Sequence, residues 1–456
     1  MRHIAVIDFG KTNAKLLVVD LATGAETAVA RTRNAVRREG PYPHHDVEAL
    51  WQFVLGALVD LERARPIDAI SITTHGAAAA LVDASGALAL PLLDYEHDGP
   101  EALRADYDAA RPAFAETGSP RLPMGLNLGA QIHWQARAFP DAFARTCHIL
   151  TLPQYWAFRL TGVAASEATS LGCHTDLWNP AAGSFSALVE RMGWRPLLPP
   201  LRRAGDILGP ILPDIAARTG LPADTPVLCG IHDSNASLVP WLAERGPRAI
   251  LSTGTWMIVM ALGGRPVALD PARDTLINVN AMGDPVPTAR FMAGREFEEI
   301  AGDNPVPASD EDEGVILARG DMALPARHAD TGPFPGQRFT WTAEPRGGER
   351  TAAASFYVAL MGAACLGLVG AQGPSVVEGP LARNHAFARM LAAATGRPVI
   401  LAGRGAGTGL GAALLAGPLL SPPTGQVTIE PPADPRWRAY AEGWRAAVRA
   451  RDPQAM

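Results

Sequence analysis

The chain has 456 residues, of which 48% are hydrophobic and 19% charged, and its formal net charge is -6. One hydrophobic core rarely grows beyond about 250 to 300 residues, so two domains are expected. This composition is that of a globular protein rather than a disordered one. The acidic balance argues against a general nucleic-acid binder, although a small anionic ligand can still find a local cationic site.

The cysteines and the apolar segments indicate a reduced, cytoplasmic protein. The four cysteines lie far apart without CxxC spacing, which predicts neither a disulfide framework nor a zinc site. The start, MRHIAVIDFG, lacks the apolar region and cleavage site of a signal peptide. The apolar run ASFYVALMGAACLGLVGAQG contains glycines between polar turns, and we expect a buried helix there rather than a membrane span.

The first predicted elements form a mixed sheet covered by helices. HIAVID (3–8) and KLLVVDL (15–21) are expected strands around the turn GKTN, and a third strand is expected near GAETAVARTR (24–33). Residues 45–64 show helical periodicity with Asp46 as the N-cap. IDAISITTHG then predicts a strand that runs into a turn at Gly76.

A weak internal repeat divides the chain. RAILSTGTWMIVMAL (248–262) again places a Ser/Thr/Gly turn between two apolar strands, about 240 residues after the first hairpin. The short polar stretch AERGPR (243–248) precedes it. We therefore predict two domains, residues 1–245 and 246–456, each opened by a hairpin.

The second half continues with alternating helices and strands. Residues 355–370 are an expected helix, SVVEG a strand, and 381–396 a helix closed by Gly396. PVILAG then predicts a strand, after which the glycine-rich GRGAGTGLG leads into the helix AALLAG. Residues 436–450 form an expected amphipathic helix.

The segment DFGKTNAK (8–15) invites a phosphate-loop interpretation, which fails. GxxxxGK[ST] needs a glycine where Ala5 stands, and a turn between two strands lacks the helix N-terminus of a phosphate loop. Asp8 could instead hold Mg²⁺ through water, with the turn amides, Thr12 and Asn13 facing phosphate oxygens. An ordinary polar hairpin is the alternative, and the second turn, Ser252 to Thr255, favours a phosphate clamp made of two hairpins.

GIHDSNAS (230–237) carries the candidate base. It follows the apolar strand TPVLCG, so His232 and Asp233 stand at a strand end, where ligands of α/β sheets commonly bind. Asp233 could accept the proton of a substrate hydroxyl during phosphoryl transfer. The alternative is that Asp233 only caps the following helix.

The glycine-rich run at 403–411 allows a dinucleotide-fold alternative. Gly407, Gly409 and Ala412 fit a relaxed GxGxx[GA], and Glu430 follows some twenty residues later. Only about 45 residues remain after Gly411, too few for the rest of a dinucleotide-binding half. Glycines that let the backbone approach an adenosine moiety explain the run with less difficulty.

Taken together, these motifs resemble those of the FGGY family of carbohydrate kinases, in the sugar kinase, Hsp70 and actin superfamily. DFGKTNAK resembles the first phosphate motif, GIHDSNAS the catalytic segment, STGTW the second phosphate motif, and EGPLARNHAF with GAGTGLGAA the adenosine region. The spacing fits over essentially the whole chain. GIHD and STGTW, about twenty residues apart, are the most specific part.

The resemblance implies an α/β fold of two RNase H-like, actin-like ATPase domains, with ATP, Mg²⁺ and a sugar meeting in the cleft between them. It implies Asp233 as the base and Asp8 as the Mg²⁺-associated carboxylate. The remaining implied contacts are His75, Gly76, Asp98, Gln154 and His232 for the sugar, and Lys11, Thr12, Asn13, Thr253, Gly254, Thr255, Gly379, Asn384 and Gly407 for the nucleotide. A homodimer is common among such proteins, which makes it a candidate assembly by analogy.

Two positions depart from the family pattern. Lys11 stands where the family usually has a small or hydroxyl residue, so it either contacts the β- or γ-phosphate or is a solvated turn residue. The adenosine segment reads Glu378-Gly379-Pro380 where two or three glycines are usual, which bears on nucleotide preference.

The function that the resemblance implies is ATP-dependent phosphorylation of a ketose or related sugar at a primary hydroxyl. Rhamnulose, fuculose and xylulose kinases are the nearest in pattern. The alternative is an ATP-binding regulatory protein on the same actin-like scaffold, which would lack a base such as Asp233.

Overall fold

The computed structural model describes residues 1–403, 407–420 and 425–451, and the chain divides into two compact units. Unit 1 contains the first 243 residues together with residues 277–285 and 407–420, and unit 2 contains the other described residues. The first changeover, between Ala243 and Glu244, lies two residues before the predicted boundary. The two later segments of unit 1 differ from the prediction, which placed both in the second domain.

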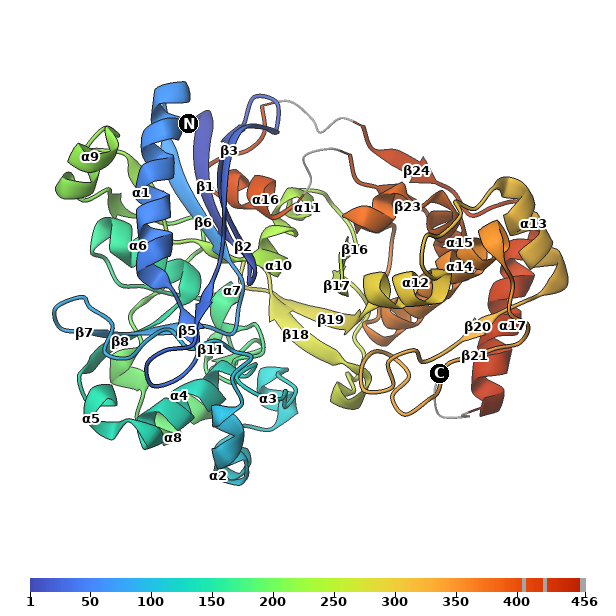
Figure 1. Ribbon diagram of the computed structural model, residues 1–456, viewed down its shortest axis with the longest axis horizontal. Coiled ribbons are helices and arrows are strands. Elements are labelled where there is room, and N and C mark those ends of the chain that lie inside the picture. The colour runs from blue at the N-terminus through green and yellow to red at the C-terminus, as the bar shows by residue number, and fades with distance from the viewer. Residues whose placement is uncertain (404–406, 421–424, 452–456) are drawn as a thin grey trace. The chain divides into compact units, whose positions relative to one another are not determined.

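Unit 1 is built on a mixed sheet whose strands follow the order β13-β14-β6-β1-β2-β3, with β15 paired to β6 (Figure 1). β1 and β2 form the predicted antiparallel hairpin, and β3 extends it. β6 runs parallel to both β1 and β15, so the three strands end at the same edge of the sheet. The strands of unit 1 are β1 His3–Phe9, β2 Asn13–Asp20, β3 Ala25–Arg33, β4 Val36–Arg37, β5 His44–His45, β6 Ala69–Thr74, β7 Ala79–Asp83, β8 Thr146–Thr151, β9 Ser166–Glu167, β10 Trp178–Asn179, β11 Ser184–Phe185, β12 Leu201–Arg202, β13 Ile207–Pro210, β14 Pro226–Leu228 and β15 Ile231–His232.

The long helix of unit 1 covers one face of this sheet. Helix α1 begins after Asp46, whose side chain accepts a hydrogen bond of 3.1 Å from Ala49 N, as predicted for the N-cap. Its apolar side packs on the strand residues Ala5, Ile7 and Phe9. The helices of unit 1 are α1 Val47–Ala64, α2 Arg104–Ala110, α3 Phe114–Thr117, α4 Leu128–Ala138, α5 Pro140–Phe143, α6 Leu152–Thr161, α7 Ala168–Leu171, α8 Ala187–Arg191, α9 Pro213–Thr219, α10 Asp233–Ala236, α11 Val239–Leu242 and α16 Thr408–Leu414.

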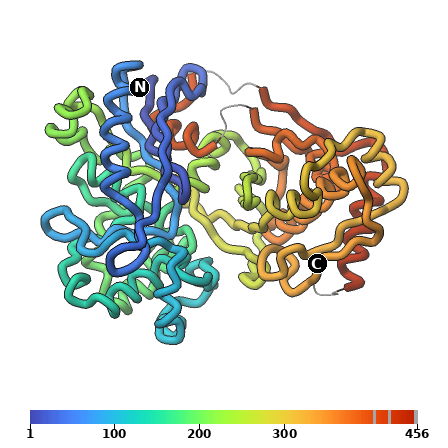
Figure 2. The backbone as a smooth tube through the Cα atoms, viewed as in Figure 1, coloured from blue at the N-terminus to red at the C-terminus, as the bar shows by residue number. Residues whose placement is uncertain are grey.

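A helix from the far end of the chain covers the opposite face. Figure 2 shows α16 beside the first strands, although about 400 residues separate them. Because side chains alternate along a strand, Ile4 and Val6 point away from α1 and pack instead with Leu410 and Ala413 of α16. Asp8 continues this alternation, so its carboxylate lies on the α16 side of the sheet.

Unit 2 repeats the pattern of an antiparallel hairpin followed by a parallel strand. β16 and β17 form the hairpin, and β22 pairs with β16 in parallel. Its elements are β16 Arg248–Thr253, β17 Met257–Leu262, β18 Thr275–Val279, β19 Pro285–Phe291, β20 Ala323–Leu324, β21 Thr340–Trp341, β22 Ser375–Glu378, β23 Val399–Leu401, β24 Val427–Ile429, α12 Ala293–Ala301, α13 Asp310–Arg319, α14 Gly347–Leu368, α15 His385–Thr395 and α17 Pro435–Arg451, with the chain passing between the units within β18 and again at the start of β19.

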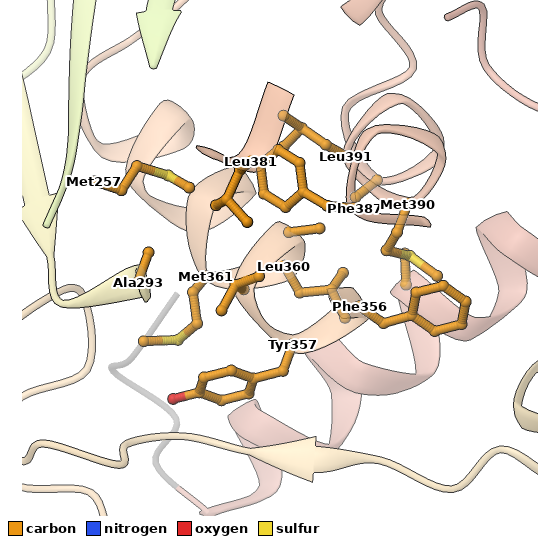
Figure 3. Close-up of a cluster of buried hydrophobic side chains, with 14 of the residues drawn as sticks. Met257, Ala293, Phe356, Tyr357, Leu360, Met361, Leu381, Phe387, Met390 and Leu391 are labelled. Atoms are coloured by element: carbon orange, nitrogen blue, oxygen red, sulfur yellow. The ribbon is translucent and has the colours of Figure 1, made fainter. Parts of the chain in front are cut away.

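The core of unit 2 forms around α14. Phe356, Leu360 and Met361 of this helix pack with Phe387 and Met390 of α15, as Figure 3 shows. By length and composition α14 could cross a membrane, with a mean hydropathy of 1.7 over its most apolar window, and 78% of that window is buried inside the structure. The prediction of a buried helix is therefore confirmed, although α14 begins eight residues earlier than expected.

Candidate active site

Asp8 lies one residue before the end of β1, and its carboxylate makes two contacts within unit 1. Lys15 Nζ lies 3.1 Å from Asp8 Oδ2, because the two residues stand opposite each other in the β1–β2 hairpin. Thr408 Oγ1 donates a hydrogen bond of 2.7 Å to the same oxygen. Oδ1 is left without a hydrogen-bond donor among the residues that the structure describes. Asp8 is thus a buried, well-oriented carboxylate with one free oxygen.

The turn after Asp8 is held by Asn34. Asn34 Nδ2 donates to Gly10 O at 2.9 Å, and Asn34 N donates to Thr12 O at 2.9 Å. Thr12 and Asn13 themselves are exposed. The turn therefore has a fixed backbone and side chains that a ligand can reach, which agrees with a phosphate-contacting role without testing it.

Lys11 does not follow the other turn residues into solvent. Its ammonium group forms a short ion pair with Asp94 and lies 4.7 Å above the centre of the Tyr95 ring. Glu96 Oε2 is 3.9 Å away. Lys11 thus binds the 94–96 segment, and in this structure neither expectation, free for a phosphate or solvated, describes it.

Asp233 begins α10 directly after β15, beside His232. Ser234 N donates a hydrogen bond of 2.6 Å to Asp233 Oδ1. The capping alternative is wrong, because His232 is the N-cap of α10 and Asp233 is the first residue of the helix. His232 Nε2 lies 3.3 Å from the same oxygen. His232 Nδ1 faces Asn235 Nδ2 at 3.2 Å. Because an amide nitrogen only donates, Nδ1 accepts and Nε2 carries the proton that faces Asp233.

The surroundings of Asp233 suit a base. Burial raises its pKa to about 6, with the nearby charge of Asp8 acting in the same direction and His75 acting against both. Burial lowers the pKa of His232 to about 4, so this ring is neutral near pH 7. Asp233 keeps 28% of its side chain exposed. Asp233 is therefore ionised at neutral pH and accessible to a substrate, and its pKa is close enough to neutral pH for it to accept a proton.

His75 and Gly76 follow β6 and lie against the same histidine. A β-carbon on Gly76 would stand 2.8 Å from His232 Nε2, so only glycine lets His232 approach this closely. His75 Nδ1 donates a hydrogen bond of 2.8 Å to Gly76 O, while its buried Nε2 has no partner among the described residues. Burial lowers the pKa of His75. His75 and Gly76 thus lie beside His232, Gly76 by making room for its ring, and their contact with a sugar stays a prediction.

Gln154 supports the site from behind. It is fully buried, and its Nε2 donates to Cys229 O and Gly230 O, each at 3.1 Å. Thr151 Oγ1 donates to Gln154 Oε1 at 2.5 Å. The predicted sugar contact is therefore placed as a residue that fixes the backbone leading into His232.

A small hollow, with room for about one water molecule, borders His75, Gly76 and His232. Leu128, Pro153 and Ser170 are among its other lining residues. It lies within unit 1, on the side of His75 and Gly76 that faces α4 and α6.

Within the segment 94–98, Asp98 is poorly placed for the predicted contact with the sugar. Its side chain is 87% exposed, and its one ion-pair contact among the described residues is His97, at 3.5 Å. Asp94, four residues earlier, is buried, accepts from Lys11, and is tied to the backbone through Asp94 N to Pro43 O. Sequence reasoning missed Asp94 because its partner, Lys11, is 83 residues away.

The turn between β16 and β17 contains one residue with a structural hydrogen-bonding role and two exposed residues. Thr253 Oγ1 donates to Glu378 O and accepts from Leu381 N at 3.2 Å, so its hydroxyl joins β16 to the turn after β22. Gly254 and Thr255 are exposed. Of the three predicted phosphate contacts, these two keep groups that a ligand can reach.

Gly379 and Asn384 shape the segment after β22. Gly379 has φ +82°, and a β-carbon there would stand 2.0 Å from Thr253 O, so the close approach requires glycine. Asn384 is the N-cap of α15, accepting from Phe387 N at 2.9 Å and donating to Ser355 Oγ at 3.0 Å. Gly379 and Asn384 therefore each have a structural role in this segment, and their contact with a nucleoside remains a prediction.

The glycine-rich run differs most from its predicted role. Gly409 and Gly411 belong to α16, where added β-carbons would stand 2.9 Å from Leu17 Cδ1 and 1.7 Å from Ala236 O. Tight packing inside unit 1 thus explains these two glycines, whereas Gly407 has open space around it and its contact with adenosine remains a prediction. The dinucleotide alternative is wrong, because β24 runs antiparallel to β23 and α16 belongs to the other unit.

The residues present fit a magnesium ion held with a phosphate ligand. The described residues contain no group of three or more His, Cys, Asp or Glu side chains placed to hold a metal by themselves. Mg²⁺ typically takes one or two carboxylates and completes its shell with water and substrate phosphates. The free Oδ1 of Asp8, beside an exposed turn, matches that requirement.

Comparisons with known proteins identify a family for this chain. Residues 3–240 match the family model described as the FGGY family of carbohydrate kinases, N-terminal domain, and residues 245–423 match that of carbohydrate kinase FGGY, C-terminal domain. L-fuculokinase from Salmonella typhi is 28% identical over 275 residues, which cover 58% of this chain and 57% of that protein. The chain thus spans a little over half the length of the curated relatives that it matches first.

Solved structures match over nearly the whole chain. A carbohydrate kinase from Novosphingobium aromaticivorans is 40% identical with a TM-score of 0.91, covering 98% of this chain and 99% of that one. A xylulose kinase from Lactobacillus acidophilus, 15% identical with a TM-score of 0.81, shares the fold and covers 100% of this chain and 99% of that one. These likenesses confirm the predicted α/β fold with two RNase H-like domains.

Proposed function

Because the chain belongs to the FGGY family of carbohydrate kinases, we propose that it transfers the γ-phosphoryl group of ATP to a primary hydroxyl of a ketose or related sugar. The observation that carries this proposal is Asp233. Its carboxylate stands at a strand end, accessible, with a pKa raised to about 6 and with the neutral His232 beside it. A purely regulatory ATP-binding protein would have no need of such a base.

In the proposed mechanism Asp233 accepts the proton of the attacking sugar hydroxyl. His232 Nε2–H faces Asp233 Oδ1 and orients the carboxylate. Asn235 in turn fixes the His232 ring through its Nδ1 atom. The charge of Asp8 makes Asp233 a stronger base, which matters as the hydroxyl loses its proton. Asp233 is the catalytic residue of this proposal, and His232 and Asn235 are positioning residues.

The phosphate side would use one turn from each unit. Asp8 Oδ1 would contact Mg²⁺, and Lys15, 3.1 Å from Asp8, supplies a cation next to it. The exposed groups of Thr12, Asn13, Gly254 and Thr255 would contact phosphate oxygens. Bound Mg²⁺ would neutralise charge on the transferred group, which is the usual role of this ion in phosphoryl transfer.

The sugar would lie against His75 and the 94–96 segment. The curated relatives include L-fuculokinase, rhamnulokinase and xylulose kinase by name, so the corresponding ketoses are the first substrates to test. We expect a cytoplasmic enzyme, with free sugar and ATP as its partners.

A coupled assay of ADP release with a panel of ketoses, polyols and sugar acids tests the proposal. Sugar-dependent ADP release by the wild-type protein and its loss in Asp233→Asn are expected. An Asp233→Asn protein that keeps most of the wild-type kcat would overturn the role of Asp233. ATP turnover that no sugar stimulates would instead favour the regulatory alternative.

A further inference from the structure

The two lysines of this chain lie in one hairpin, Lys11 in its turn and Lys15 in β2. Of its 40 basic residues 38 are arginines, and the two lysines are Lys11 and Lys15. Lys15 pairs with Asp8 on the phosphate side, whereas Lys11 pairs with Asp94. An ammonium group is compact and can turn its three donors freely, unlike the larger, planar guanidinium group. The position of Lys11 between a carboxylate and a ring face suits that smaller group.

The Lys11–Asp94 pair lies next to the residues of the proposed sugar site. Tyr95, whose face the ammonium covers, packs edge to face with His75 at 5.8 Å between ring centres. Burial raises the pKa of Tyr95, and the charge of Asp233 is among the groups that raise it further. Lys11 lowers the pKa of His75, after the larger effects of burial, Gly76 and Asp233. Lys11, Tyr95, His75 and Asp233 therefore surround the same region of unit 1.

Among the described residues, the charges around Lys11 leave no cation free for an acidic ligand. Asp94 and Glu96 both face the ammonium, and Asp233 acts together with Lys11 on the pKa of His75. Asp94 uses Oδ1 for both Lys11 and Glu96 N, so Oδ2 has no hydrogen-bond donor among the described residues. An oxygen of this kind accepts hydrogen bonds from hydroxyl groups and repels a carboxylate.

We propose that the Lys11–Asp94 pair is a specificity-determining element of the sugar site, which selects neutral ketoses and polyols over sugar acids. Asp94 Oδ2 accepts a hydroxyl of the sugar, and Lys11 holds the Asp94 carboxylate in place. This inference rests on the proposed kinase function. It assigns Lys11 to the sugar and not to the phosphates.

The test compares four proteins: wild type, Asp94→Asn, Lys11→Met and the double variant Lys11→Met/Asp94→Asn. For each, kcat and KM are measured with neutral ketoses and with aldonates and ketoaldonates, and KM is measured separately for ATP. The wild type is expected to prefer neutral sugars by about 100-fold or more in kcat/KM. Asp94→Asn leaves Lys11 uncompensated, and it should shift the preference toward sugar acids by about tenfold or more.

The double variant separates specificity from folding. It removes both charges while keeping side chains of similar size, so it should restore any loss of thermal stability that Lys11→Met causes by leaving Asp94 buried and unpaired. In the double variant the shift in kcat/KM toward sugar acids should disappear, while the KM for neutral sugars stays about tenfold above that of the wild type. A purely structural pair would instead regain the wild-type KM together with the wild-type stability.

Three results would overturn the inference. One is an unchanged acid-to-neutral ratio in Asp94→Asn, and another is a wild type that prefers sugar acids. The third is a rise in ATP KM, with unchanged sugar KM, in Lys11→Met, which would return Lys11 to the phosphates. If the wild type phosphorylates nothing in the panel, the proposed function fails. In that case the inference is tested by binding: the rise in melting temperature caused by neutral sugars is compared with the rise caused by sugar acids in each of the four proteins. If neither class of ligand binds, the inference is overturned as well.

Discussion

Thr408 donates a hydrogen bond of 2.7 Å to the carboxylate of Asp8, 400 residues earlier in the chain. The contact exists because Asp8 lies on the sheet face that α16 covers. It orients Oδ2 and leaves Oδ1 available. The candidate phosphate site therefore depends on Thr408, a residue of the glycine-rich motif that the sequence analysis assigned to adenosine rather than to the phosphates.

Replacing Thr408 by Val should weaken this site. The side chain keeps its shape but loses its donor, so we expect a loss of about 1 kcal/mol in the free energy of unfolding and about tenfold in kcat. Denaturant unfolding and the coupled ADP assay measure the two effects. Thr408→Ser retains the hydroxyl and is the control. Equal behaviour of the Val and Ser proteins would show that the hydrogen bond has no functional role.

The rate should depend on pH through Asp233. A base with a pKa of about 6 must be ionised to accept a proton, so kcat/KM is expected to fall as the pH drops below about 6. The negative charge of Asp8 helps to raise this pKa, so Asp8→Asn should lower the pKa of Asp233. Carbon NMR of the Asp233 carboxyl group reports that pKa without needing activity. A pKa that does not move would mean that the two carboxylates do not interact.

Stability should also respond to the ionisation of Asp233, with a definite sign. Burial raises its pKa in the folded protein above the unfolded value, so the folded protein binds more protons between about pH 4 and pH 6, and ionisation lowers stability as the pH rises through that window. Asp233→Asn removes this cost. Urea unfolding should therefore show that the stability of the variant relative to the wild type increases from about pH 4 to about pH 6 and then stays level. A gain that runs in the opposite direction would contradict the raised pKa.

Gly411→Ala should disturb the support behind the base. An added β-carbon would stand 1.7 Å from Ala236 O at the end of α10, the helix that Asp233 begins. Such overpacking typically costs about 1–3 kcal/mol, and we expect kcat to fall because α10 must shift. Gly56→Ala, in α1 of the same unit, is the matched control because nothing lies within 4 Å of its added β-carbon. That variant should be as stable as the wild type or more stable by up to about 1 kcal/mol.

Much of the fold could be predicted because its signals are local. The hairpins β1–β2 and β16–β17 follow from apolar runs around Gly and hydroxyl residues, and the start of α1 follows from Asp46. The hydrogen-bond pattern of the site could not be predicted in this way. Lys11 with Asp94, and Asp8 with Thr408, are contacts between residues that only the folded chain brings together.

Some contacts of the site could be inferred from the sequence pattern, and others could not. Asn235 stands three residues after His232 in GIHDSNAS, a spacing that places an amide beside the imidazole at the start of a helix. The glycines of α16 were ambiguous, because small residues serve close packing and ligand approach equally well. Asp98 and Asp94 share one segment, and the sequence contains nothing that distinguishes the exposed carboxylate from the buried one.

The return of α16 to unit 1 has a consequence for synthesis of the protein. While the ribosome is still translating the second half, the finished N-terminal segment lacks the helix that covers Ile4, Val6, Leu17 and Ile231. Unit 1 is therefore completed only after most of unit 2 has been translated, and until then the nascent chain carries an uncovered apolar sheet face. An expression fragment that stops near residue 245 would keep that face permanently, which makes a linked segment containing residues 407–420 the better design for producing unit 1 alone.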